Sequence, residues 1–274
     1  MKVAIIGCGY VGTEVARYWS QEKDLVVTVT TTTNSRVAGL ENLASQVVVV
    51  RGNDRERLKS VVAGQELVLL SVGARNAASY RETYLGTAET LVSVLQETPT
   101  VRQLIYTSSY SVFGDRAGAV VDETSPVKPA NENGQILAET EKVLLSAATE
   151  KLKVCLFRLG GIYGRQRELV KIFSRVAGTT RPGQGDDATN WIHLDDIVAA
   201  IEFARIHQLE GVYNLVDDDK LTSGELINAV LAKNNLSPVN WDTNQKSPRP
   251  YNARVSNQKL KNLGFQLIHP QTEF

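Results

Sequence analysis

Gly7-Cys8-Gly9-Tyr10-Val11-Gly12 decides the fold class of this chain. The stretch follows a short apolar run at 3–6 and leads into residues 13–19, whose composition suits a helix. A strand, a glycine turn and a helix in this order are typical of a dinucleotide-binding βα unit. The first glycine permits the turn, the second lets the backbone approach a pyrophosphate, and the third lets helix and strand pack closely. We therefore expect a dinucleotide at the start of this helix, in contact with Gly7, Gly9, Tyr10, Val11 and Gly12.

Apolar runs alternate with helical stretches along the first 160 residues. The predicted strands are 2–7, 25–30, 46–50, 66–72, 102–108 and 153–159. The predicted helices are 11–21, 35–44, 54–63, 78–97 and 133–148. Most of the strands are continuously apolar, which is typical of a parallel sheet covered by helices on both faces. The sequence therefore predicts an α/β fold with a Rossmann-type doubly wound parallel sheet.

The pattern changes after residue 160, where glycines, prolines and polar residues interrupt the chain. A helix at 194–207, a strand at 211–216 and a helix at 222–234 are predicted in this part. We expect two domains. The Rossmann domain comprises 1–160 and about 194–210, and a smaller C-terminal substrate lobe comprises about 161–193 and 211–274. Ligands of open α/β folds bind at the carboxyl edge of the sheet, which such a lobe would cover.

Composition limits the partners that this protein is expected to have. Thirty basic residues balance thirty acidic ones, so nothing points to nucleic acid or to an anionic membrane. The apolar runs are too short to span a bilayer and no signal peptide is visible. Cys8 and Cys155 lie in runs predicted to be buried, which suits a reducing compartment. We therefore expect a cytoplasmic protein. We also expect no metal, because His193, His207 and His269 have no metal-ligand spacing.

The end of the second strand is expected to set the choice between NAD and NADP. An acidic residue there would bind the adenosine ribose of NAD, but the chain reads Thr31-Thr32-Thr33-Asn34-Ser35-Arg36. Asn34 or Ser35 is predicted to cap the next helix, which places Arg36 in its first turn, against the helix dipole. The 2′-phosphate of NADP would offset that cost, whereas a solvated surface arginine is the alternative. We predict NADP over NAD, with Thr31 and Arg36 at the adenosine end.

Four later segments carry a second signal. They are TSSYSVFG at 107–114, RLGGIYG at 158–164, WIHLDDI at 191–197 and VYN at 212–214. Together with the early glycines, and in this order, they resemble the extended short-chain dehydrogenase/reductase family, which includes nucleotide-sugar epimerases and dehydratases. The resemblance covers nearly the whole chain and implies the predicted fold.

The resemblance also implies where the ends of the cofactor lie. Ser71 and Gly73 are expected to pass close to the nicotinamide. Asn53 or Asp54 is expected near the adenine, and the sequence leaves both alternatives open.

The resemblance breaks at the family's catalytic pair. In the family a tyrosine acts as general acid/base, a lysine four residues later lowers the pKa of that tyrosine, and a serine binds the reacting oxygen. Ser109 matches the serine, but Asn133 and Leu137 stand at the tyrosine and lysine positions. Tyr110 and His193 are candidates for the missing proton transfer, although each also suits a structural role.

Two arginines and one apolar stripe allow two interpretations each, whereas two glutamates allow one. Arg165 and Arg167 suit a phosphate or carboxylate of the substrate, or a solvated loop. We interpret Glu139 and Glu141 as solvated residues of the helix that carries Asn133. Apolar residues at helical spacing within 78–97 suit either a homodimer or core packing; they are Tyr84, Ala88, Leu91 and Leu95.

Two functions follow from these observations. The first is an NAD(P)-binding oxidoreductase or epimerase-like enzyme that acts on a small polar substrate, such as a nucleotide sugar, with a non-standard proton-transfer group. The second is a dinucleotide-binding sensor or scaffold without catalysis. The retained Ser109 favours the enzyme, whereas the loss of both tyrosine and lysine favours the sensor.

Overall fold

The computed structural model describes residues 1–74 and 76–274, which form two compact units. The first unit comprises Met1–Ser108, Gln135–Arg158 and Val198–Tyr213. The second unit comprises Ser109–Gly134, Leu159–Ile197 and Asn214–Phe274. The division expected from the sequence differs in one segment, because it assigns 109–134 to the Rossmann domain.

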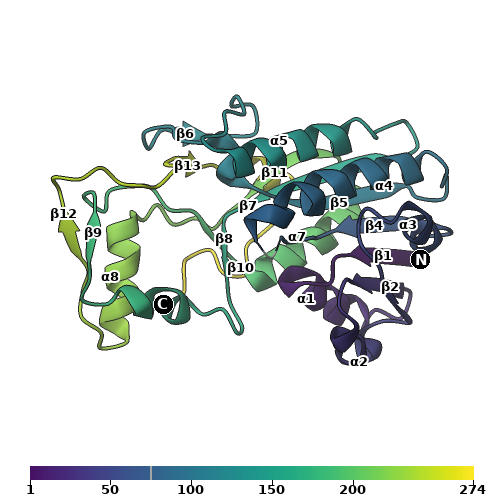
Figure 1. Ribbon diagram of the computed structural model, residues 1–274, viewed down its shortest axis with the longest axis horizontal. Helices are drawn as coiled ribbons and strands as arrows, with labels where there is room; N and C mark the ends of the chain where they lie inside the picture. The colour runs from purple at the N-terminus through teal and green to yellow at the C-terminus, as the bar shows by residue number, and fades with distance from the viewer. Residues whose placement is uncertain (75) are drawn as a thin grey trace. The chain divides into compact units, whose positions relative to one another are not determined.

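A seven-stranded sheet has the order β11-β7-β5-β4-β1-β2-β3. Its strands are β1 (Lys2–Ile6), β2 (Val26–Thr31), β3 (Gln46–Val49), β4 (Leu67–Leu70), β5 (Gln103–Ser109), β7 (Lys153–Leu159) and β11 (Gly211–Leu215). The pairs from β3 through β2, β1 and β4 to β5 are all parallel. The strand order reverses between β1 and β4, as in doubly wound folds. The predicted Rossmann-type parallel sheet is therefore confirmed (Figure 1).

Helices cover both faces of this sheet in the first unit. On one face α3 (Arg55–Val62), α4 (Thr87–Leu95) and α5 (Glu132–Leu145) share a core with β4, β5 and β7. Figure 1 shows α4 and α5 side by side over these strands. The helices α1 (Tyr10–Trp19) and α7 (Leu194–His207) are joined by a buried hydrogen bond from Trp19 Nε1 to Glu202 Oε2, 2.9 Å long. Helices on both faces explain why the strands are apolar without alternation.

The segment after β2 is less helical than the sequence predicts. It consists of a 3-10 turn at Asn34–Arg36, the single α-helical turn α2 (Val37–Leu40) and a second 3-10 turn at Glu41–Leu43. The residue before the first turn is Thr33, and no side chain caps that turn. The predicted cap at Asn34 or Ser35 is therefore wrong, because both residues lie inside the turn.

The apolar stripe of the predicted helix 78–97 packs inside the first unit. This segment forms a π-helical stretch, Glu82–Gly86, followed by α4. Ala88, Leu91 and Leu95 are buried in the core shared with the sheet. Core packing thus accounts for these three residues, and the homodimer stays a prediction. Cys8 and Cys155 are buried, as expected.

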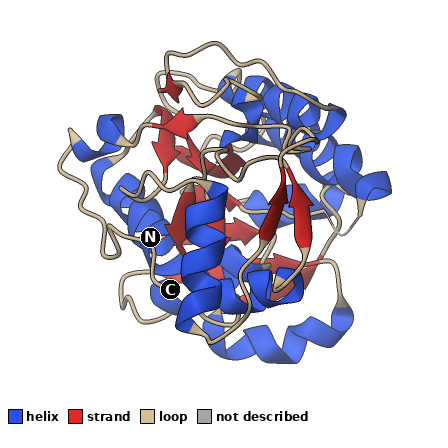
Figure 2. Ribbon diagram, turned by 90° about the vertical axis from the view of Figure 1, so that its left-hand side faces the viewer, coloured by secondary structure: helices blue, strands red, loops and turns tan. Residues whose placement is uncertain are grey.

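The second unit is built from short elements. Three two-stranded pairs join β8 (Gly161–Tyr163) to β10 (Trp191–His193), β9 (Thr180–Pro182) to β12 (Asn240–Asp242), and β6 (Val120–Val121) to β13 (Arg254–Val255). Its helices are α6 (Leu169–Phe173), α8 (Ser223–Lys233) and α9 (Gln258–Lys261). Long loops, drawn tan in Figure 2, connect them. A capping box between Thr222 and Glu225 starts α8, which satisfies the first amides of that helix.

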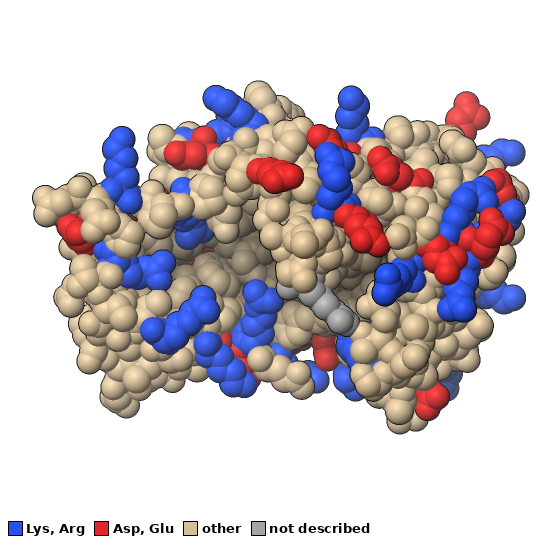
Figure 3. Space-filling model, in the orientation of Figure 1, with Lys and Arg blue, Asp and Glu red and all other residues tan. Residues whose placement is uncertain are grey.

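The surface carries charges of both signs. On the face shown in Figure 3, basic and acidic side chains adjoin one another, in keeping with the net charge of zero. Among the described residues, no helix is both long enough and apolar enough to cross a membrane.

Candidate functional site

Two of the three motif glycines are required by close packing. Gly7 has a φ of +92°, and a Cβ there would lie 2.6 Å from the carbonyl oxygen of Ser71. A Cβ on Gly12 would lie 2.4 Å from the carbonyl oxygen of Gly7. Real Cβ atoms do not approach a carbonyl oxygen so closely, so a side chain at either position would displace the turn from the sheet.

Gly9 meets a different requirement. A Cβ at this position would have no neighbour within 4 Å. Gly9 is also the N-cap residue of α1, and no side chain caps that helix. The first amides of a helix carry the positive end of its dipole. The space over Gly9 is thus open at a point where the backbone attracts an anion.

A cavity of about 430 Å³ in the first unit includes this open space. It follows the carboxyl ends of β1, β2 and β4, the edge at which ligands of doubly wound sheets bind. Seven residues predicted at the cofactor site line it: Gly7, Gly9, Thr31, Arg36, Asn53, Ser71 and Gly73. The cavity is large enough for a cofactor-sized ligand.

The expected adenosine end of the cavity is polar. Arg36 is exposed, and its Nη2 donates to Thr13 Oγ1 at 3.2 Å. Asn53 lines the cavity, and its Nδ2 donates to Glu82 Oε1 at 2.7 Å. Asp54 instead caps α3, since its Oδ1 accepts from the backbone N–H of Arg57, and it lines a smaller neighbouring hollow together with Asn53. Of the two alternatives near the adenine, Asn53 is the one at the main cavity.

The opposite end is formed by the residues after β4. Thr107 Oγ1 donates to Ser71 Oγ at 3.1 Å, and this pair is buried. A Cβ on Gly73 would have no neighbour within 4 Å. A ligand can therefore approach the backbone here, as the resemblance implies for the nicotinamide.

Some lining residues were not predicted as site residues. They are Thr32, Thr33, Arg51, Gly52, Glu82, Thr83 and others near them. A Cβ on Gly52 would lie 1.9 Å from Thr87 Oγ1, so this glycine permits the approach of α4. The threonine run at 30–33 could have indicated these lining residues, because four consecutive short polar residues stand at the end of a buried strand.

The expected catalytic residues lie at the end of β5 and on α5. Ser109 ends β5, and its Oγ accepts from the backbone N–H of Ser111 at 3.2 Å. On α5, Asn133 is exposed and Leu137 is buried, 4% exposed. An amide does not titrate in the physiological range and an aliphatic side chain supplies no charge, so neither replaces a phenol or an ammonium group.

Tyr110 is part of the core of the second unit. Its side chain is buried, its hydroxyl accepts from Arg249 Nη2 at 2.8 Å, and its ring packs edge-on against Tyr251. Burial raises the pKa of Tyr110, although Arg249 partly offsets this effect. The structural interpretation of Tyr110 therefore accounts for its contacts.

The interpretation of Glu141 as a solvated residue is wrong. Its side chain is 4% exposed and lies in the first unit against Arg158, which is 5% exposed. Arg158 Nη2 donates to Glu141 Oε2 at 2.7 Å, and Ser108 Oγ donates to Glu141 Oε1 at 2.6 Å. Glu139, two residues earlier, forms an exposed ion pair with Arg81, as a solvated residue would. Glu141 is thus a core residue, whereas Glu139 is a surface residue.

The substrate candidates lie in the second unit. Arg165 and Arg167 are exposed in the turn that follows β8. Because β8 pairs with β10, His193 lies beside Tyr163. Burial lowers the pKa of His193, and so does the neighbouring His269, whose ring centroid lies 3.8 Å away. No pattern in the sequence predicts this contact between two histidines 76 positions apart.

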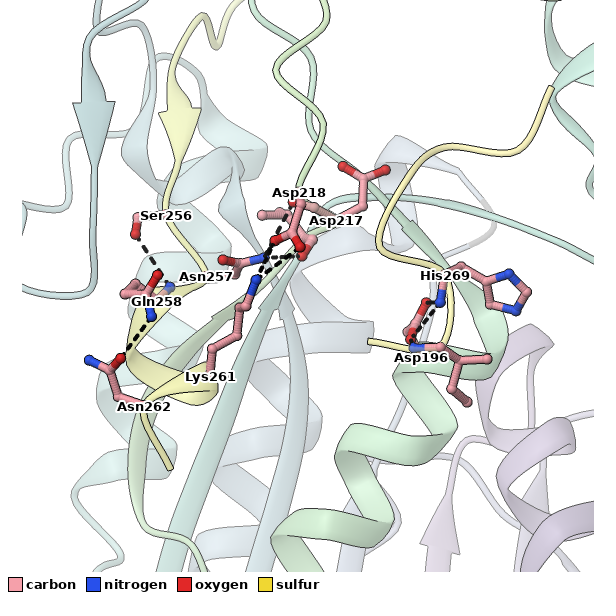
Figure 4. A network of polar contacts seen from close by, with 11 residues as sticks. Asp196, Asp217, Asp218, Ser256, Asn257, Gln258, Lys261, Asn262 and His269 are labelled. Carbon is pink, nitrogen blue, oxygen red and sulfur yellow. Dashed lines mark hydrogen bonds and ion pairs between the residues drawn. The ribbon is translucent and has the colours of Figure 1, made fainter. Parts of the chain in front are cut away.

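Within the second unit, aspartates bind residues of the C-terminal segment. Asp196 accepts from the backbone N–H groups of Ile268 and His269, and Figure 4 shows the His269 ring pointing away from it. Asp217 is 5% exposed, accepts from Thr272 Oγ1 at 2.7 Å, and has its pKa raised to about 7 by burial. The carboxylate of Asp218, next to it in Figure 4, binds Lys261 Nζ at 2.9 Å.

Known proteins resemble this chain in sequence and in fold. Protein YeeZ of Escherichia coli is 31% identical over 205 residues, which span 73% of this chain and 71% of that protein. The dTDP-glucose 4,6-dehydratase of Bacillus anthracis, solved in complex with NAD, has a TM-score of 0.81 at 18% identity, over 99% of this chain and 94% of the other. The UDP-glucose 4-epimerase of Thermotoga maritima, solved with UDP-glucose, has a TM-score of 0.81 at 19% identity, over 98% and 94%.

The family comparison agrees with the resemblance noted in the sequence. The model of the NAD dependent epimerase/dehydratase family matches residues 3–215, which include the glycine turn, the end of β5 and the β8–β10 region. This match covers most of the chain and includes the cavity described above. The chain therefore belongs to the NAD dependent epimerase/dehydratase family.

Proposed function

We propose that the first unit binds NADP(H), or less tightly NAD(H), with the pyrophosphate over Gly9 at the start of α1. The observation that carries this proposal is the contrast among the three glycines. Gly7 and Gly12 are packed against backbone, whereas Gly9 leaves open space at the N-terminus of α1. The second unit is proposed to be the substrate-binding lobe.

Gly9→Val is expected to weaken dinucleotide binding at least tenfold without unfolding the protein. The new side chain meets no protein atom within 4 Å of its Cβ, but it occupies the space in which a pyrophosphate would contact the backbone. Isothermal titration calorimetry with NADPH measures the loss, and the melting temperature reports on the fold.

Gly39→Val is the matched control for this experiment. A Cβ on Gly39 also meets nothing within 4 Å, and Gly39 lies in α2, outside the residues that line the cavity. Binding that survives in Gly9→Val, or that falls equally in both variants, contradicts the proposed site.

Arg36 is proposed to bind the 2′-phosphate of NADP. The strand β2 ends at Thr31 without a carboxylate, and the exposed Arg36 guanidinium lies at the same end of the cavity. A guanidinium that binds a phosphate forms charge-assisted hydrogen bonds. The solved Bacillus anthracis dehydratase is in complex with NAD, the cofactor that lacks this phosphate.

Arg36→Ala is expected to weaken NADPH binding at least tenfold and to leave NADH binding unchanged, because one charge-assisted contact contributes about 1.5–3 kcal/mol. Parallel calorimetric titrations of the two cofactors measure the selectivity. Arg17→Ala removes another partly exposed arginine and should change neither affinity. NADH binding tighter than NADPH binding, and indifferent to Arg36→Ala, would reverse the assignment.

The function that we propose is an oxidoreductase or epimerase-like reaction on a small polar substrate, such as a nucleotide sugar. The dinucleotide, when bound, supplies the hydride chemistry. Ser109 Oγ already accepts from the Ser111 amide, so its own hydroxyl hydrogen can donate to a substrate oxygen. Arg165 and Arg167 are proposed to bind a phosphate or carboxylate of the substrate, and His193 to contact it. Since Asn133 and Leu137 cannot act as acid and counter-charge, another group moves the proton.

The second candidate is a sensor or scaffold that binds the dinucleotide without turnover. The observation that favours it is the simultaneous replacement of tyrosine and lysine by Asn133 and Leu137. A panel of nucleotide sugars, added to the protein loaded with either redox form of the cofactor, separates the two functions by the nicotinamide absorbance. Oxidation or reduction that is lost in Ser109→Ala supports the enzyme. Tight binding with no turnover supports the sensor.

A further inference from the structure

His193, Asp195 and His269 present three metal-binding atoms to one another in the second unit. Asp195 Oδ2 lies 3.7 Å from His193 Nδ1 and 3.6 Å from His269 Nε2. All the ligand atoms of the group lie within 4.8 Å of one another. In a tetrahedral site with metal–ligand distances near 2.0–2.1 Å, two ligand atoms lie about 3.3 Å apart. Small shifts of the side chains would therefore bring these atoms to a common ion.

The surroundings of His269 orient it as a metal ligand. Its Nδ1 lies 2.7 Å from Glu273 Oε1, and Asp196 accepts from its backbone N–H. A carboxylate that accepts from one ring nitrogen leaves the lone pair on the other, and it also makes that nitrogen more basic. The His269 Nε2, which then carries the lone pair, faces the Asp195 carboxylate. A lone pair and a carboxylate repel each other unless a proton or a cation lies between them.

The surroundings of His193 hold its ring in place and leave its Nδ1 with a replaceable hydrogen bond. The ring lies against Tyr163 and His269, with ring centroids 5.1 Å and 3.8 Å away. Its Nδ1 accepts a long hydrogen bond of 3.2 Å from the backbone N–H of Asp195, which an ion would replace. A Cβ on Gly164 would lie 3.0 Å from Nε2, so the absence of a side chain there lets the ring occupy this position.

We propose that His193, Asp195 and His269 form a binding site for a divalent transition-metal ion of the zinc type. Two imidazoles and one carboxylate suit Zn²⁺ and its neighbours, whereas Mg²⁺ and Ca²⁺ prefer oxygen ligands only. The Asp195 side chain is 51% exposed, while those of His193 and His269 are 12% and 18% exposed. The fourth position therefore faces solvent and takes a water molecule or an oxygen of a small ligand. Histidine spacing in the sequence predicts no metal site, because His193 and His269 come together only in the folded chain.

The test is a Zn²⁺ titration of the untagged, metal-free full chain against a chromophoric chelator. We expect one strong site per chain, at least tenfold weaker in His193→Ala and in His269→Ala. Excess Mg²⁺ should not compete. Co²⁺, added in place of Zn²⁺, should give the visible spectrum of a tetrahedral ion, and this spectrum should be absent from both variants.

His207→Ala is the matched control, because the chain has three histidines and His207 is exposed at the end of α7. Its affinity should equal that of the unaltered chain. Glu273→Gln tests the orienting contact at an exposed side chain, and an affinity loss of about tenfold is expected. Unchanged affinity in His193→Ala and His269→Ala, or an equal loss in His207→Ala, would overturn the proposal, and so would the absence of stoichiometric binding. None of these results depends on whether the first unit binds a dinucleotide.

Discussion

Arg158→Met is expected to lower the free energy of unfolding by about 3–5 kcal/mol, the usual cost of leaving one member of a buried ion pair without its partner. Arg158 donates to both carboxylate oxygens of Glu141, from Nε and from Nη2. After the substitution, the Glu141 carboxylate would keep the hydrogen bond from Ser108 but no neutralising charge. Urea unfolding followed by far-UV circular dichroism measures the change.

The same helix offers a matched comparison. Glu139 pairs with Arg81, and these side chains are 37% and 62% exposed, so Arg81→Met should cost less than about 1 kcal/mol. In the double variant Arg158→Met/Glu141→Leu both buried charges are absent, and most of the lost stability should return. Burial does not set the cost of removing the charge if Arg158→Met costs no more than Arg81→Met, or if the double variant is less stable than the single one.

The sheet could be predicted from the sequence because each of its strands has a local signature. The strands β1 and β4 are apolar and buried along almost their whole length, and no alternation is needed where helices cover both faces. The predicted strands of the first 160 residues agree with the observed ones to within two residues at either end. The glycine turn was predictable for the same reason, since the requirement for a small residue lies within one βα unit.

Apart from the residues that the family resemblance implies, contacts between distant parts of the chain could not be predicted from the sequence. Glu141 was interpreted as solvated because helix periodicity says nothing of Arg158, which lies on β7. His193 and His269 come together because β10 and the C-terminal segment meet, and no spacing rule contains that information. The short strand pairs β6–β13 and β9–β12 were missed likewise, since two or three residues are too few for a period to show.

Asp217→Asn is expected to stabilise the second unit at alkaline pH and to reduce the pH dependence of its stability. The folded protein holds the Asp217 pKa at about 7, against an ordinary value of 3.8, because the carboxyl is buried and lies near Asp218 and Asp219. The folded state therefore binds this proton more tightly than the unfolded state does. The resulting stabilisation is complete below about pH 4 and is lost as the pH rises through about 7.

At pH 8 the carboxylate of the unaltered chain is charged and buried, whereas an amide is neutral and still accepts from Thr272 Oγ1. The difference in free energy of unfolding between the variant and the unaltered chain should therefore shift in favour of the variant from pH 4 to pH 8, by at most about 4 kcal/mol. Urea unfolding at the two pH values, followed by the fluorescence of Trp191 and Trp241 in the second unit, measures it. Asp186→Asn removes an exposed aspartate of the same unit and should change stability by less than about 0.5 kcal/mol at either pH. Equal effects of Asp217→Asn at pH 4 and pH 8 would show that the Asp217 proton is bound alike in both states, contrary to its burial.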